Sequence, residues 1–126
     1  MLKTLLFIAI GGALGAIMRF LSQATIYELV GRTFPYGTLF VNVTGSFLMG
    51  LLSIMLVQKF NLGAHWHMAI LVGVLGSFTT FSTFSLETLV LFEQGDLFKA
   101  FSNILMSVVL CILAVWAGAL LVKQLV

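Results

Sequence analysis

Charged residues are so widely spaced in this chain that most of it must fold without them. Long stretches with no Asp, Glu, Lys or Arg run from Arg32 to Lys59, from Lys59 to Glu87 and from Lys99 to Lys123. Because a helix rises about 1.5 Å per residue, about 20 residues cross a bilayer core about 30 Å thick. With 8% charged and 61% hydrophobic residues, the chain cannot build the surface of a soluble domain. The sequence predicts an integral membrane protein and excludes a soluble enzyme, a nucleic-acid-binding protein and a disordered chain.

The hydrophobic stretches divide the chain into four segments, each long enough to span a membrane as a helix. Turn-forming residues, among them Gly31, Pro35 and Gly37, separate the first segment from the second. The short polar turn 93–96 separates the third from the fourth. The roughly ten-residue alternation of a membrane β-barrel is absent. We therefore predict an all-α membrane protein in which residues 1–126 form a single four-span domain, with helices over about 4–27, 38–58, 68–92 and 99–122.

The distribution of Lys and Arg hardly favours one orientation of the chain in the membrane over the other. With four spans, Lys3, Lys59 and Lys123 fall on one side, and Arg32 and Lys99 fall on the other. An excess of Lys and Arg normally sets the orientation, so this balance predicts a chain that inserts both ways and forms antiparallel pairs. A fixed orientation, set by other features, is the alternative. In either case we expect a multi-pass protein of the cell inner membrane, the plasma membrane.

The third segment contains a run that suits a straight helix poorly. Gly76 is followed by Ser77 and by two threonines, Thr79 and Thr80, in the middle of the hydrophobic stretch. A helix broken at mid-membrane frees backbone carbonyls, which are tolerated only inside protein or beside water and can bind a cation. A continuous helix, whose hydroxyl groups donate to earlier carbonyls, is the alternative.

Beyond this run, helical spacing predicts an aromatic face and a polar face. Three phenylalanines recur every third residue and three polar residues recur every fourth: Phe78, Phe81 and Phe84, then Thr79, Thr83 and Glu87. An aromatic row usually packs against other helices. Beside hydroxyl groups in a membrane, the positive edges of the rings can instead line a path for a small anion. Glu87 fits such a path as an acceptor of hydrogen bonds or in its protonated form.

Polar and small residues also mark the first two segments. Asn42 and Ser46 lie one helical turn apart, and the Asn42 amide can donate hydrogen bonds to an ion or to another helix. Arg19, within the first segment, marks either a water-filled vestibule that concentrates anions or a side chain that reaches the lipid headgroups. Gly11 and Gly15, four residues apart, predict close contact with a neighbouring helix.

Three motifs resemble those of Fluc-type fluoride channels, the CrcB family, and together they cover almost the whole chain. They are Gly15-x-x-x-Arg19, Asn42-Val-Thr-Gly45-Ser46-Phe47 and, the most specific, Gly73-Val-Leu-Gly76-Ser-Phe-Thr79-Thr80-Phe81-Ser82-Thr83-Phe84. The resemblance implies a dual-topology homodimer in the lipid bilayer, with two antiparallel fluoride pores.

The resemblance also implies the residues that line each pore. Phe81 and Phe84 would offer their ring edges to fluoride, and Asn42 would offer a hydrogen-bond donor. A polar track beside the rings would consist of Thr38, Ser82, Thr83 and Glu87.

A structural cation and a vestibule follow from the same resemblance. Backbone carbonyls of Gly76 and Thr79, from both subunits, would hold a sodium ion (Na⁺) at the centre of the dimer. Arg19 would lie at the aqueous vestibule.

The hypothesis is therefore a channel through which fluoride leaves the cytoplasm down its electrochemical gradient, which reduces fluoride toxicity. No nucleophile, catalytic dyad or metal-ligand cluster calls for an enzyme, and no basic cluster calls for a nucleic acid. Two alternatives remain. One is a small dual-topology, proton-coupled multidrug-type transporter, in which Glu87 would carry the proton. The other is a structural subunit of a larger membrane complex.

Overall fold

The computed structural model describes residues 1–60 and 62–125, and within them every regular element is a helix. In chain order these are α1 (Leu2–Val30), α2 (Tyr36–Gln58), α3 (Ala64–His67), the π-helix η1 (Met68–Leu75), α4 (Gly76–Phe78), α5 (Phe81–Glu93) and α6 (Leu97–Leu125). They form four segments that are long and apolar enough to cross a membrane: Leu2–Val30, Tyr36–Gln58, Ala64–Glu93 and Leu97–Leu125.

The predicted all-α, four-span architecture is thus confirmed, with longer helices than the hydrophobic stretches alone indicated. α1, for example, continues through Glu28 to Val30, three residues beyond the predicted end. A helix does not end where hydrophobicity ends, because polar residues in its last turn can face the headgroups and water.

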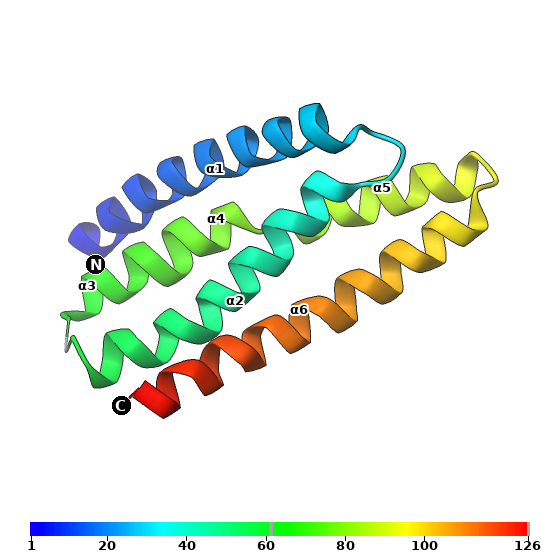
Figure 1. The fold of residues 1–126 in the computed structure, drawn as a ribbon. Helices are drawn as coiled ribbons and strands as arrows, with labels where there is room; N and C mark the ends of the chain where they lie inside the picture. Colours follow the sequence, from blue (N-terminus) through cyan, green and yellow to red (C-terminus); the bar gives the residue numbers. More distant parts are fainter. Residues whose placement is uncertain (61, 126) are drawn as a thin grey trace.

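The four segments run alternately in opposite directions (Figure 1). Both termini and the connection after α2 lie at one end of the molecule, while the connections 31–35 and 94–96 lie at the other. α2 packs along α6, and α1 packs along η1. The second end carries all four acidic residues of the chain, in the last turns of α1 and α5, in the 94–96 turn and beside the 31–35 connection: Glu28, Glu93, Asp96 and Glu87.

Glycines allow both helix pairs to approach closely. A Cβ atom on Gly50 of α2 would clash with the carbonyl oxygen of Val115 on α6. On α1, a Cβ atom on Gly11 would meet the Ala69 carbonyl, and one on Gly15 the Val74 carbonyl. The close contact predicted for Gly11 and Gly15 is therefore confirmed, and it is made with η1. Small residues at helix contacts are what a membrane environment favours, since apolar side chains gain nothing by leaving lipid.

Many large apolar side chains are on the outer surface, and several polar side chains are buried. Large side chains such as Phe20, Phe98 and Ile112 are exposed, whereas Thr38 and Asn103 are only 2% and 1% exposed. This distribution reverses that of a soluble bundle and suits a hydrocarbon solvent.

The 94–96 turn is held by one short-range ion pair. Lys99 Nζ lies 2.9 Å from Asp96 Oδ2, and the Lys99 amide donates to Asp96 Oδ1 at 3.4 Å. The hydrogen bond from Lys99 lowers the pKa of the Asp96 carboxyl below its ordinary value. Asp96 therefore stays charged at neutral pH and begins α6 with a side-chain acceptor near its first amides.

Candidate functional site

The third segment stops being helical at Thr79 and Thr80. α4 ends at Phe78, Thr79 and Thr80 have extended backbone (φ −85°, ψ 157° and φ −152°, ψ 114°), and α5 begins at Phe81. In a continuous α-helix, the amide of Thr80 would donate to the Gly76 carbonyl. Here it donates to Oδ1 of Asn42, at 2.7 Å. The Gly76 carbonyl has lost its usual donor.

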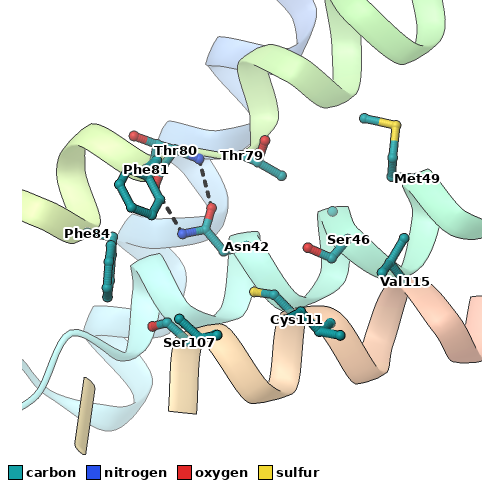
Figure 2. Close-up of a pocket in the computed structure, with 13 residues that line it drawn as sticks. Asn42, Ser46, Met49, Thr79, Thr80, Phe81, Phe84, Ser107, Cys111 and Val115 are labelled. Atoms are coloured by element: carbon teal, nitrogen blue, oxygen red, sulfur yellow. Dashed lines mark hydrogen bonds between the residues drawn. The ribbon is translucent and has the colours of Figure 1, made fainter. Parts of the chain in front are cut away.

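Asn42 of α2 pairs with this break through both polar atoms of its side chain. While Oδ1 accepts from the Thr80 amide, Nδ2 donates to the Thr80 carbonyl at 3.0 Å (Figure 2). The predicted hydrogen bond from Asn42 to another helix is therefore present. An amide nitrogen carries two hydrogens, so one N–H of Asn42 remains for another acceptor.

The Thr80 hydroxyl caps α5 and gathers two further hydroxyls. It accepts from the Thr83 amide at 3.2 Å, donates to Thr83 Oγ1 at 3.0 Å and lies 3.3 Å from Ser82 Oγ. In a continuous α-helix, the Thr83 amide would donate to the carbonyl of Thr79. Both Gly76 and Thr79 thus have carbonyls whose helical donors are used by side chains.

Two of the three predicted aromatic residues pair after the break. The rings of Phe81 and Phe84 have centroids 5.2 Å apart, tilted by 51°, with Phe81 76% exposed and Phe84 7% exposed. Phe78 lies in α4, before the break, and its inclusion in the same row is wrong. The predicted row of Thr79, Thr83 and Glu87 is wrong for Thr79, whose hydroxyl donates to the Leu75 carbonyl at 3.0 Å. Two extended residues interrupt the 3.6-residue period on which both rows depended.

A central cavity of about 480 Å³ lies between α2, the break and α6 (Figure 2). It is lined mainly by apolar and hydroxyl-bearing side chains: Asn42, Gly45, Ser46, Met49, Thr79, Thr80, Phe81, Phe84, Ser107, Val108, Cys111, Ile112 and Val115. The structure therefore brings Asn42, Phe81 and Phe84 to one space. Sequence reasoning missed the α6 residues, although Ser107 and Cys111 stand four residues apart and therefore share one face of that helix.

Farther along α5, Glu87 joins the polar side chains of α1 and α2. Its Oε1 accepts from the hydroxyl of Thr38 at 2.9 Å and from the hydroxyl of Tyr27 at 3.0 Å. Gln23 Nε2 donates to Thr38 Oγ1 at 3.0 Å. Glu87 is thus an acceptor of hydrogen bonds, as one of the two interpretations held. Gln23 and Tyr27 are four residues apart, and this spacing could have predicted that they share one face of α1.

A buried polar chain also joins α5 to α6. Asn103, 1% exposed, donates to Thr88 Oγ1 at 2.9 Å and accepts from Ser107 Oγ at 3.4 Å, while Thr88 donates to the Phe84 carbonyl at 2.7 Å. These bonds fix the turn of α5 that carries Phe84. They were not predicted, although Asn103 and Ser107 stand four residues apart, a spacing that places them on one face of a helix.

Arg19 stands apart from these groups. It is half-buried on α1, lines neither the central cavity nor the Glu87 region and has no ion pair among the residues that the structure describes. Arg32, by contrast, lies at the Glu87 end, with its guanidinium carbon 4.8 Å from the centroid of the Tyr27 ring.

Comparison with known proteins identifies the family. The chain matches the family described as CrcB-like protein, Camphor Resistance (CrcB), over residues 6–119. A protein of Methylococcus capsulatus, named fluoride-specific ion channel FluC, is 60% identical over 118 residues, which are 94% of this chain and 52% of that protein. Proteins of the same name from Geobacter sulfurreducens and Shewanella amazonensis are 44% identical over 124 residues and 46% identical over 121, covering 98% and 96% of this chain and 100% and 97% of theirs. This chain therefore spans about half of the first relative and essentially all of the other two. The chain belongs to the CrcB family.

Proposed function

We propose that this chain forms a fluoride channel of the membrane and is not an enzyme. The relatives named above are fluoride-specific ion channels, and two of them match this chain over nearly their whole length. The observation that carries the proposal is the meeting of Asn42, Phe81 and Phe84 at one cavity beside the helix break. An amide N–H and positive ring edges suit a small anion without offering it a negative charge.

The proposed path leads from the central cavity along α5. Fluoride leaves the remaining N–H of Asn42 and the edges of Phe81 and Phe84, passes the hydroxyls of Ser82 and Thr83, and reaches Thr38 and Glu87. Fluoride holds its water strongly, so each step must replace that water with a donor. The Ser82 and Thr83 hydroxyls at the start of α5 can do so. The Thr38 hydroxyl, which carries one hydrogen and donates it to Glu87, would have to turn from Glu87 to donate to fluoride.

We further propose an antiparallel, dual-topology homodimer. Three Lys residues lie at the end with both termini, and Arg32 and Lys99 lie at the other end, so the Lys and Arg bias is small. All four acidic residues lie at that second end. Antiparallel pairing places the acidic end of one copy beside the basic end of the other. Phe81, 76% exposed in one copy, is the kind of ring that a partner would cover.

The proposal includes a structural Na⁺ at the dimer axis, with the helix break at mid-membrane. Among the described residues, no three His, Cys, Asp or Glu side chains gather as metal ligands, so carbonyl oxygens are the fitting donors. Gly76 and Thr79 fit, because the amides that would serve their carbonyls are bonded to side chains instead. Gly76 is also exposed in one copy, which suits a carbonyl shared with a partner. A hard cation prefers oxygen ligands, and neutral carbonyls supply them without cancelling its charge.

In the cell inner membrane, such a channel needs no energy source. With the cytoplasm negative, the potential favours the exit of an anion by about 2.3 kcal/mol per 100 mV. Fluoride that enters as neutral HF dissociates inside and leaves through the pore. Arg19, half-buried and without an ion pair among the described residues, is proposed to lie at the aqueous vestibule and to raise the local concentration of anions.

Ion efflux from liposomes tests the function directly. Purified protein is reconstituted, and fluoride and chloride release are read with separate electrodes after the membrane potential is collapsed. Fast fluoride release with chloride retained is expected. Release no faster than from protein-free liposomes, with dimers present, would contradict the channel. Proton-dependent cation uptake that Glu87→Gln abolishes would then point to the multidrug-type transporter.

A further inference from the structure

A second cavity, the end cavity, lies beside the outer part of α5. It has a volume of about 320 Å³, and its lining includes Tyr27, Arg32, Glu87 and Gln94. Glu87 therefore belongs both to the proposed polar track and to the wall of this cavity. A path that reaches Glu87 along α5 continues into it.

A carboxylate at this position poses an electrostatic problem for an anion path. Glu87 Oε1 is covered by the hydroxyls of Tyr27 and Thr38, whereas Oε2 is buried and has no hydrogen-bond partner among the described residues. Glu28 and Glu93 lie in the last turns of the neighbouring helices α1 and α5. The field of these carboxylates repels an anion unless a cation nearby offsets it.

Arg32 is the basic residue in the lining of the end cavity. Its guanidinium is exposed, stacks over the Tyr27 ring at 4.8 Å and has no ion pair among the residues described. Tyr27 in turn donates to Glu87. The same ring thus fixes the acceptor atom of Glu87 and holds the positive charge that balances it. With Arg32, the formal charges of the lining sum to zero; without it, one negative charge remains.

We infer that the end cavity is an outer mouth of the fluoride path and that Arg32 concentrates fluoride there. This inference rests on the proposed function and assigns a residue that the central site does not include. Arg32 acts through its charge and does not contact the break. Its effect is therefore screened by salt, because the Debye length falls from about 30 Å at 10 mM to about 3 Å at 1 M.

The test compares fluoride efflux for Arg32→Gln and Lys99→Gln at low and high ionic strength. Both changes remove one positive charge at the same end of the molecule, but Lys99 does not line the end cavity. Sodium is held constant, fluoride is kept below saturation and an impermeant organic salt sets the ionic strength. We expect Arg32→Gln to slow efflux roughly three- to tenfold at about 10 mM and less than about twofold at 1 M. Lys99→Gln and Arg32→Lys should stay near the parent rate.

Other results for these variants would contradict the role proposed for Arg32. An unchanged rate for Arg32→Gln at low ionic strength overturns the inference, as does a slowing that is equal at both ionic strengths. An equal loss for Lys99→Gln shows a general surface charge and also overturns it. If the parent protein itself releases no fluoride, the proposed channel function is wrong. If the parent releases fluoride but Arg32→Gln does not slow it, only the role of Arg32 is wrong.

Discussion

The side chain of Asn42 is hydrogen-bonded to both backbone groups of Thr80, across two different helical segments. For the Thr80 amide, this side chain takes the place of the Gly76 carbonyl, which a continuous helix would supply. Thr80 is 6% exposed, so the buried Thr80 amide depends on Asn42 for its hydrogen bond. The break is held by α2 as much as by its own sequence.

Asn42→Ala should destabilise the protein and slow fluoride efflux strongly. It leaves the buried Thr80 amide without a partner, which costs about 1–3 kcal/mol. Asn42→Asp keeps the acceptor for that amide and removes the donor, so it should be more stable than Asn42→Ala and still conduct poorly. Thermal unfolding in detergent and liposome efflux measure the two effects. Ser53→Ala, about three turns along α2 and outside the lining of the central cavity, serves as a control. Normal stability of Asn42→Ala would contradict the role of the pair.

Phe81→Ile should impair fluoride flux at little cost in folding, since the ring is largely exposed in one copy. Phe84→Ile should impair flux and also lower stability by about 1 kcal/mol or more, because that ring is buried. Size-exclusion chromatography distinguishes a pore defect from a packing defect. Monomers in place of dimers would mark these rings as packing residues.

Thr80→Ala should raise the sodium concentration at which fluoride flux is half-maximal. Loss of the cap on α5 costs about 1 kcal/mol and frees the Thr83 amide to donate to the Thr79 carbonyl, which then competes with the proposed cation. Efflux is titrated against Na⁺, with an organic cation replacing it. We expect the midpoint to shift to higher Na⁺. A parent protein whose flux is the same with and without Na⁺ would remove the basis for the site.

Gly50→Ala should separate α2 from α6, because its methyl group meets the backbone of Val115. Overpacking of this kind costs about 1–3 kcal/mol. Gly63→Ala is the matched control, since a Cβ there meets nothing within 4 Å. The thermal midpoint should fall for the first variant only, and equal midpoints would show that the contact can relax.

The sequence predicted the four helices because hydrophobic length is a property of each segment by itself. It also left open a break near Thr79, where Gly, Ser and Thr weaken a helix. It did not predict which side of the break Phe78 and Thr79 occupy, since a period measured along the chain assumes a helix that does not stop. The partners of Asn42 and Glu87 could not be predicted either. They depend on how α2 and α1 rotate about their axes, and one sequence carries little information on rotation when every face is apolar. The π-helical geometry of η1 has no signal in residues 68–75 that we can identify.

The order of the two partners along the chain bears on how the protein is made. α2 precedes α5, so the ribosome delivers Asn42 to the membrane before Thr80 leaves the exit tunnel. An extended dipeptide is costly in hydrocarbon while its amide and carbonyl are unpaired. In this chain Asn42, whose side chain pairs with those groups, is synthesised first. If a rearranged gene encoded α2 after α5, Thr79 and Thr80 would be synthesised before Asn42. The third segment would then be expected to form an uninterrupted helix until α2 was made.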